Sequence, residues 1–258
     1  MGIDFHDKTN RNTYATRKAD SSWYEVIKGL VTIENISNAL DIGCGGGIYS
    51  KALADMGIDS VTGIDFSESI LEGARDNCKE YKNISFKHGN AFDTGLGSNR
   101  FDLVLERALI HHIDDIQACF QEGYRVLKNN GYYIIQDRTP EDCLIEGNEN
   151  HVRGYFFELF PRLVEKETNR RYNSEFVIKT LEAAGFNEIE EVNLWETRKV
   201  YKSKDKLLKD LRERTGRSIL HELDNKELKL LIDHVNGKIS TNHNIIEKDK
   251  WTIWKAVK

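Results

Sequence analysis

A glycine-rich segment near residue 43 carries the clearest chemical signature in the chain. It reads ALDIGCGGGIYSKAL (39–53), in which an apolar run is followed by a glycine turn and then by a helical pattern. Glycines in such a turn let backbone amides approach a ligand, and the N-terminus of the following helix adds partial positive charge. The segment therefore predicts a ligand-binding loop; a generic tight turn between strand and helix is the alternative.

The dinucleotide fingerprint G-x-G-x-x-G does not fit this loop. Gly43 and Gly45 match its first two glycines, but Ile48 stands at the third. A start at Gly45 meets Ser50 at that place instead. Neither register favours an NAD-dependent oxidoreductase with a Rossmann fold, because the third glycine allows the close packing of helix and strand.

The motif Asp-x-Gly-x-Gly-x-Gly is complete, at Asp41, Gly43, Gly45 and Gly47. It resembles motif I of the class I S-adenosylmethionine (SAM) methyltransferases. SAM carries an ammonium and a sulfonium group, so a carboxylate at Asp41 attracts it, whereas a pyrophosphate would be repelled there. Asp65 ends the next predicted strand, where a carboxylate accepts ribose hydroxyls in dinucleotide and SAM enzymes alike. A favourable charge at a helix N-terminus is the other interpretation of Asp65.

Further segments resemble the same family. They are GNAFD (89–93), VLKNNGYYII (126–135) and LEAAGFNEI (181–189). The resemblance covers about residues 14–137 and 174–196 and the last strand. Asn90 stands where the family usually has Asp, and we expect its amide oxygen to accept a hydrogen bond from the adenine amine. Cys44, Phe66 and Ala91 complete the cofactor-binding residues that the resemblance implies.

Three residues outside these motifs are also cofactor-binding candidates by resemblance. Tyr14 and Arg17 precede the first predicted helix, where relatives close a lid over SAM, and Arg17 is placed to pair with the SAM carboxylate. Glu106 ends the fourth predicted strand and is expected to face the methionine moiety. An ordered surface arm and a solvated turn acid are the respective alternatives.

The tandem histidines in LERALIHHIDD (105–115) are the candidates for proton transfer. Methyl transfer is an in-line displacement, and most of its acceleration comes from positioning and water exclusion. A hydroxyl or phenol acceptor must also lose a proton, which His111 or His112 would take just past the fourth strand. Structural roles, one histidine packing beneath the cofactor and the other bonding a turn, are the alternative.

Apolar runs alternate with helical patterns from residue 38 onward, which indicates βαβ units. We predict an α/β fold: a Rossmann-like, doubly wound, seven-stranded sheet that is mostly parallel with an antiparallel last strand. A capping box at Ser22-x-x-Glu25 is expected to start the first helix, and Gly185 to stop a later one. The expected strands cover 39–43, 60–65, 84–88, 101–106, 132–137, 188–198 and 250–257, and the expected helices 20–31, 47–56, 67–80, 114–128, 174–184 and pieces of 203–235.

Two long insertions interrupt the alternation of strands and helices. The family resemblance implies that they form a helical cap over the cofactor. The expected organisation is an arm and helix (1–35), a SAM-binding core (36–137), a cap insertion (138–172), more core (173–198), a second cap insertion (199–245) and a final core strand (246–258). Basic and aromatic residues in and beside the insertions make Arg138, Arg153, Tyr155 and Trp195 the substrate-binding candidates. Solvated charges and a core role for the aromatic residues are the alternatives.

Composition narrows the function further. The 258 residues carry 37 basic and 42 acidic side chains, a net charge of −5 that argues against nucleic-acid binding. Neither Pro140 nor Pro161 is followed by Pro or Cys, which excludes the Asn/Asp-Pro-Pro-aromatic and Pro-Cys motifs of nucleic-acid methylating enzymes. The four cysteines are far apart in the sequence, which suggests neither disulfides nor a metal site. The sequence shows no apolar leader and no apolar membrane span, so we expect a cytoplasmic protein that does not bind membranes.

These observations predict a SAM-dependent methyltransferase that acts on a small soluble acceptor, with an anionic group as one possibility, and releases S-adenosylhomocysteine. A non-catalytic SAM-binding sensor is the alternative outside enzymes. The acceptor atom stays open because O-, N-, S- and C-methylating members share these cofactor residues, and the sequence leaves the oligomeric state open.

Overall fold

A computed structural model describes residues 18–241 and 243–258 of the chain; Tyr14 and Arg17 lie outside these residues. The chain divides into two compact units. In the described residues, the core unit comprises 18–137, 174–194 and 252–258, and the insert unit comprises 138–173, 195–241 and 243–251.

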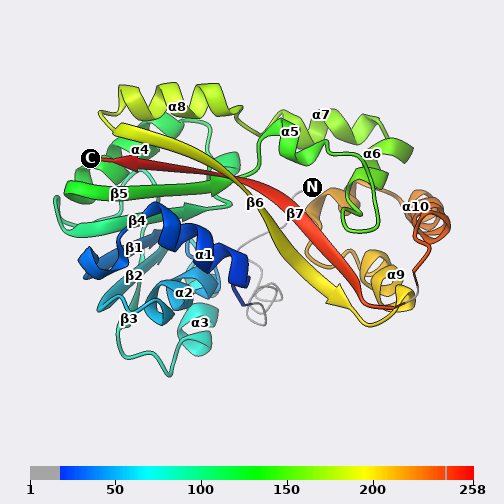
Figure 1. The fold of residues 1–258 in the computed structure, drawn as a ribbon, viewed down its shortest axis with the longest axis horizontal. Helices are drawn as coiled ribbons and strands as arrows, with labels where there is room; N and C mark the ends of the chain where they lie inside the picture. Colours follow the sequence, from blue (N-terminus) through cyan, green and yellow to red (C-terminus); the bar gives the residue numbers. More distant parts are fainter. Residues whose placement is uncertain (1–17, 242) are drawn as a thin grey trace. The chain divides into compact units, whose positions relative to one another are not determined.

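The core unit contains a seven-stranded sheet in the order β3-β2-β1-β4-β5-β7-β6 (Figure 1). The strands are β1 (Asn38–Ile42), β2 (Ser60–Asp65), β3 (Ile84–His88), β4 (Phe101–Arg107), β5 (Leu127–Asp137), β6 (Asn187–Tyr201) and β7 (Ile245–Val257). The first five strands pair in parallel, and β7 pairs antiparallel with β5. The predicted sheet is therefore confirmed, and the strand order reverses between β1 and β4.

Helices cover both faces of this sheet. They are α1 (Ser21–Leu30), α2 (Ile48–Asp55), α3 (Glu68–Asn77), α4 (Ile116–Val126) and α8 (Ser174–Ala183). Figure 1 shows α1, α2 and α3 on one face and α4 and α8 on the other. On the first face Trp23, Ile27 and Leu53 pack with strand residues such as Leu103 and Ile134 in one buried cluster. This packing fixes the strand ends, where ligands of such sheets bind.

The ends of two helices test the expected signals. Asp20, not Ser22, is the N-cap of α1, and its carboxylate accepts from the Ser22 amide at 3.0 Å. The expected N-cap at Ser22 is therefore wrong by two residues, because Asp20 offers a stronger, charged acceptor. Gly185 does follow α8 with a left-handed φ of +103°, as expected.

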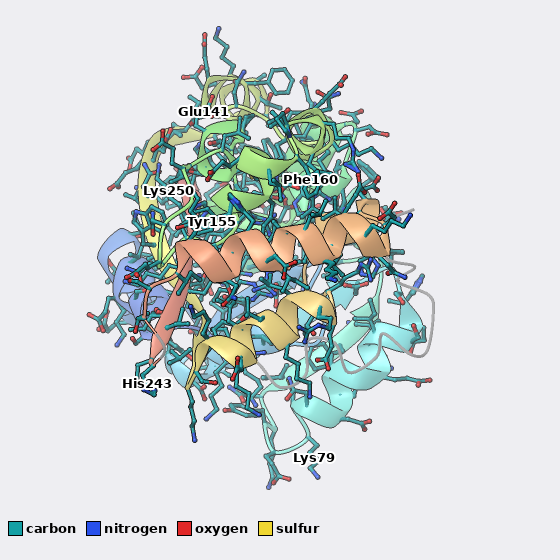
Figure 2. The ribbon with its side chains drawn as sticks, turned by 90° about the vertical axis from the view of Figure 1, so that its right-hand side faces the viewer. Lys79, Glu141, Tyr155, Phe160, His243 and Lys250 are labelled. Atoms are coloured by element: carbon teal, nitrogen blue, oxygen red, sulfur yellow. The ribbon has the colours of Figure 1, made fainter. Side chains whose placement is uncertain are left out.

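The insert unit has its own apolar core. Its helices are α5 (Pro140–Cys143), α6 (Gly154–Leu159), α7 (Arg162–Thr168), α9 (Lys204–Arg212) and α10 (Asn225–Lys238). In Figure 2, α9 and α10 lie side by side, and Phe156, Leu207 and Leu231 are among the fully buried residues between the helices. The unit also includes the end of β6 and the beginning of β7, so it is more than the two helical insertions. No helix in the described residues is long and apolar enough to cross a membrane.

Candidate active site

The glycine loop joins β1 to α2 in the core unit. Gly43, Gly45 and Gly47 adopt φ values of +71°, +51° and +75°, a left-handed conformation that side chains disfavour. The amides of Gly43 and Cys44 both donate to the Ile64 carbonyl at 2.9 Å, which ties the loop to β2. A Cβ built on Gly45 would meet nothing within 4 Å. The loop is therefore held in shape from beneath and has open space above its second glycine.

Asp65 closes the same loop. Its carboxylate accepts from the Gly45 amide at 3.0 Å and from the Ser67 amide at 3.0 Å. The side chain is buried, and this burial raises the pKa of Asp65 above its ordinary value despite those two bonds. Asp65 thus has a structural duty toward the loop in addition to the predicted contact with ribose hydroxyls.

Asp41 lies below the loop at the end of β1. Its carboxylate is 2% exposed and accepts from the Ser50 hydroxyl at 2.6 Å. Burial raises the pKa of Asp41 to about 6, and the nearby Arg107 guanidinium opposes this. Arg107 itself lies 4.1 Å from the Tyr49 ring centroid. A cationic ligand would stabilise the charged form of this buried carboxylate, whose pKa lies near neutral pH.

Asn90 has partners within its own turn. Its Oδ1 atom accepts from the amides of Phe92 and Asp93, both at 2.8 Å. These two bonds close the turn that follows β3. The expected hydrogen bond from an adenine amine to the same oxygen stays a prediction.

Glu106 has partners inside the core unit. It is fully buried, and its carboxylate accepts from the Tyr133 hydroxyl at 2.6 Å and from the Cys119 thiol at 3.2 Å. Burial raises the pKa of Glu106 to about 7. The expected contact of Glu106 with the methionine moiety, through its backbone or its carboxylate, stays a prediction.

His111 is held by a carboxylate. It lies in the short 3₁₀-helix η3 (Ile110–His112) after β4, and its Nδ1 atom is 2.8 Å from Asp137 Oδ2. The His111 amide also donates to Asp137 at 3.3 Å. The rings of His111 and His112 are 4.0 Å apart between centroids. A carboxylate at Nδ1 fixes the tautomer whose Nε2 lone pair accepts a proton.

Sequence reasoning missed Asp137 and Arg107 as partners of the candidate residues. Both end parallel strands, β5 and β4, and the rule that ligands bind at strand ends is the signal that points to them. Of the remaining cofactor candidates, Cys44 and Ala91 are buried, whereas Phe66 is 48% exposed.

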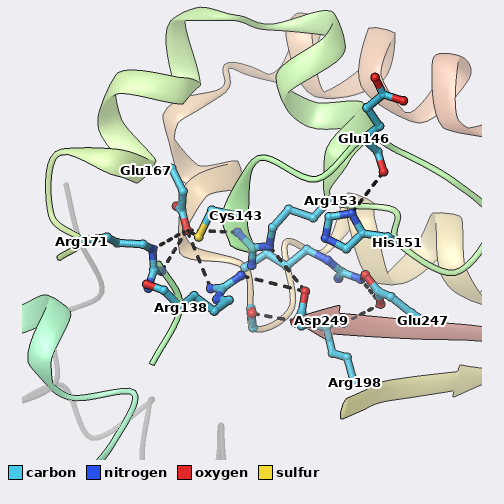
Figure 3. A network of polar contacts seen from close by, with 12 residues as sticks. Arg138, Cys143, Glu146, His151, Arg153, Glu167, Arg171, Arg198, Glu247 and Asp249 are labelled. Atoms are coloured by element: carbon cyan, nitrogen blue, oxygen red, sulfur yellow. Dashed lines mark hydrogen bonds and ion pairs between the residues drawn. The ribbon is translucent and has the colours of Figure 1, made fainter. Parts of the chain in front are cut away.

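The substrate-binding candidates lie in the insert unit. Arg138 and Arg153 belong to a buried polar network (Figure 3). Trp195 is 41% exposed and contacts the His151 ring edge-on, with centroids 5.7 Å apart. Tyr155 is buried in the apolar cluster of the unit, which agrees with the alternative core role, and its contact with a substrate stays a prediction.

Comparisons with known proteins agree with this fold and loop. Residues 40–135 match the family model for a methyltransferase domain. A demethylmenaquinone methyltransferase from Listeria welshimeri is 30% identical over 154 residues, which are 58% of this chain and 64% of that protein. The chain thus matches less than two thirds of the length of that curated relative.

Solved structures share the architecture over nearly the whole chain. A candidate methyltransferase from an antibiotic biosynthesis pathway of Anabaena variabilis has a TM-score of 0.71 and 20% identity, covering 93% of this chain and 98% of its own. Phosphoethanolamine N-methyltransferase 2 of Haemonchus contortus, solved with SAM, has a TM-score of 0.59 and 19% identity, covering 99% of this chain and 60% of its own. Residues 40–135 of the chain are therefore similar to a methyltransferase domain.

Proposed function

We propose that this chain is a SAM-dependent methyltransferase acting on a small soluble acceptor. The observation that carries the proposal is the glycine loop tied to the Asp65 carboxylate, with the buried Asp41 carboxylate beneath it. SAM fits these residues: the open backbone at Gly45 admits the methionine moiety, and Asp41 balances its positive charge. When bound, SAM supplies an electrophilic methyl group on a sulfonium.

The residues of this chain bind, orient and, for some acceptors, take a proton. Asp65 holds the loop and offers oxygen atoms to ribose hydroxyls. Asp137 accepts from His111 Nδ1–H, so a proton from an acceptor hydroxyl or phenol goes to Nε2. An amine that arrives neutral needs no such base, and positioning alone then accelerates the transfer.

A small acceptor suits the charge of the chain and the presence of the insert unit, which we propose as the cap of the site. The Listeria relative is named for demethylmenaquinone and the Haemonchus protein for phosphoethanolamine. Both names are of small molecules, which supports the class of acceptor and leaves its identity open.

Two alternatives are less well supported. An NAD-dependent oxidoreductase would need a glycine at Ile48 or Ser50, and it would place a pyrophosphate over the Asp41 carboxylate. A SAM-binding sensor shares the loop, and the His111–Asp137 pair favours an enzyme over it, because a sensor needs no proton acceptor at the strand ends.

Calorimetry and a labelling assay test the proposal. We expect S-adenosylhomocysteine to bind and NAD not to bind. Incubation with methyl-labelled SAM and fractions of a cell extract should place the label in the small-molecule fraction. Tight NAD binding without any response to SAM would contradict the proposal, and binding without label transfer to any fraction would favour the sensor.

A further inference from the structure

A polar cluster lies inside the insert unit (Figure 3). We call it the Arg153 cluster, and it comprises Arg138, His151, Arg153, Glu167 and Asp249. All five residues are buried or nearly so, and they come from segments far apart in the sequence. Charges taken out of water need close partners, so the quality of their contacts decides what the cluster is for.

Arg153 is poorly satisfied by the described residues. Its side chain is 8% exposed, yet it makes one hydrogen bond to them, of 3.5 Å to Glu167, and one ion pair of 3.6 Å with Asp249. Burial and the neighbouring Arg138 guanidinium lower the pKa of Arg153 to about 10. A guanidinium has five N–H donors, so most of its capacity is unused.

Arg217 in the same unit shows what a purely structural arginine looks like. Its side chain is 1% exposed and donates to both oxygens of Glu247, at 2.7 and 2.9 Å. It also donates to Asp210 at 2.8 Å and to the Tyr201 hydroxyl at 3.1 Å. Short bidentate contacts are the usual geometry of such pairs, so the long contacts of Arg153 set it apart.

The carboxylates near Arg153 do not satisfy its remaining hydrogen-bond donors. Glu167 makes its short contacts with Arg170 and Arg171, at 2.8 and 2.9 Å. Asp249 lies 3.6 Å from Arg153 and 3.9 Å from Arg138. Each acid is thus shared among several arginines and remains at a distance from Arg153.

His151 provides an independent observation beside Arg153. It is 1% exposed, its Nδ1 atom is 3.4 Å from the Glu146 carbonyl, and its Nε2 atom has no hydrogen-bond partner in the part of the chain that the structure describes. Its other ring neighbour is the half-exposed Trp195. Buried polar atoms without partners are rare in folded proteins and often mark a place that a ligand completes.

We infer that Arg153, His151 and Arg138 form a binding site for one oxyanion group, a carboxylate or a phosphate. The Arg153 fork would donate to two oxygens of the group. His151 Nδ1 donates to the Glu146 carbonyl, so Nε2 would donate to the oxyanion in the protonated ring, which the negative charge of the oxyanion favours. The oxyanion would give Arg153 the close contacts that Arg217 already has. Glu167 and Asp249 then hold the arginines in place without competing for the fork.

This inference goes beyond the proposed function, and binding of the oxyanion does not depend on methyl transfer.

Titration calorimetry of the full chain with inorganic phosphate, and separately with acetate, tests the site against chloride at equal ionic strength. We expect phosphate, acetate or both to bind, and Arg153→Gln to weaken the binding by about 10- to 100-fold, as for a lost charged hydrogen-bond pair. Arg153→Lys should recover part of it, because charge returns without the fork. Arg162→Gln removes the same charge from an exposed residue and should leave the affinity within about 2-fold. Equal losses in Arg153→Gln and Arg162→Gln, or no binding of either anion by the unaltered chain, would overturn the inference.

A second variant keeps the test decisive if Arg153→Gln fails to fold. His151→Phe keeps an aromatic ring against Trp195 and removes the unpartnered nitrogen, so the thermal midpoint should stay or rise while oxyanion affinity falls by about 5-fold or more. An unchanged affinity would show that His151 is structural and would contradict the site. Binding of S-adenosylhomocysteine to the unaltered chain is measured in parallel. If the unaltered chain does not bind S-adenosylhomocysteine, the proposed function is contradicted. If it binds S-adenosylhomocysteine but neither oxyanion, only the oxyanion site is contradicted.

Discussion

At the scale of single residues, Asp65 carries two duties that can be separated by experiment. Asp65→Ala removes the acceptor of the Gly45 amide as well as the predicted acceptor of ribose hydroxyls. We expect S-adenosylhomocysteine binding to weaken by about 1–3 kcal/mol, the usual value of charged hydrogen bonds. Calorimetry measures this, and Asp65→Asn, which keeps one oxygen acceptor, should lose less. Equal affinity in all three proteins would remove Asp65 from the cofactor site.

Glu106 predicts a dependence of stability on pH. The fold raises the pKa of Glu106 from 4.5 to about 7, so this acid stabilises the fold fully below pH 4.5 and loses that contribution as pH rises through about 7. Glu106→Gln removes the titration, so relative to the unaltered chain the variant should gain about 3 kcal/mol in the free energy of unfolding between pH 4.5 and 8.

Urea unfolding at pH 5 and pH 8 measures this difference. Glu122 on α4 is the matched control, because Arg125 holds its pKa below the ordinary value, against the effect of burial. The stability that Glu122 contributes is present above its unfolded pKa of 4.5 and is lost as pH falls below it, so Glu122→Gln should leave the change in stability between pH 5 and pH 8 close to that of the unaltered chain. Parallel profiles for Glu106→Gln and the unaltered chain would contradict the raised pKa.

The His111–Asp137 pair makes a prediction about rate. If the acceptor is a hydroxyl or phenol, His111→Ala should lower the transfer rate by about 10²-fold or more while cofactor affinity changes little. Asp137→Asn should also lower it, because the amide no longer holds the Nδ1–H tautomer. Single-turnover rates across pH measure this. Full activity in both variants with an unchanged pH profile leaves positioning as the source of catalysis.

A sequence motif predicts backbone conformation better than it predicts the contacts of a side chain. The glycine motif fixes backbone conformation, and all three of its glycines have the left-handed φ that it requires. Asn90 and Glu106 sit at motif positions too, and the structure adds partners that a short motif does not reveal. These partners are the Phe92 amide for Asn90 and the Tyr133 hydroxyl for Glu106.

At the scale of elements, periodicity identified the strands and helices of the core unit because each element buries one regular face. The N-terminus of α1 is the exception. Asp20 and Ser22 are both possible N-caps there. Asp20 is the N-cap because its charged carboxylate accepts a hydrogen bond from the Ser22 amide. The insert unit was harder to predict, because its apolar residues contact one another across long stretches of sequence and not along one repeating pattern.

The cap of α1 can be tested directly. Asp20→Ala should destabilise the chain by about 1 kcal/mol, since it leaves an N-terminal amide without its acceptor. Glu25→Ala, at the partner position of the rejected capping box, should cost less than half of that, because the box accepts Glu or Gln and Ala removes the contact. Denaturant midpoints of the two variants compare them, and a larger cost for Glu25→Ala would restore the box.

At the scale of the whole molecule, the chain passes between its two units several times, twice within the continuous strands β6 and β7. We have proposed the insert unit as the cap of the site, and a cap governs substrate access. We therefore expect S-adenosylhomocysteine to slow amide hydrogen exchange in 138–173 and 195–241 as well as in the glycine loop. Helix α8 on the opposite face of the sheet from α2 serves as the internal control and should exchange at the same rate with and without the ligand. Slowing confined to the glycine loop would mean that the insert unit does not close over the cofactor, and its helices would then need another role.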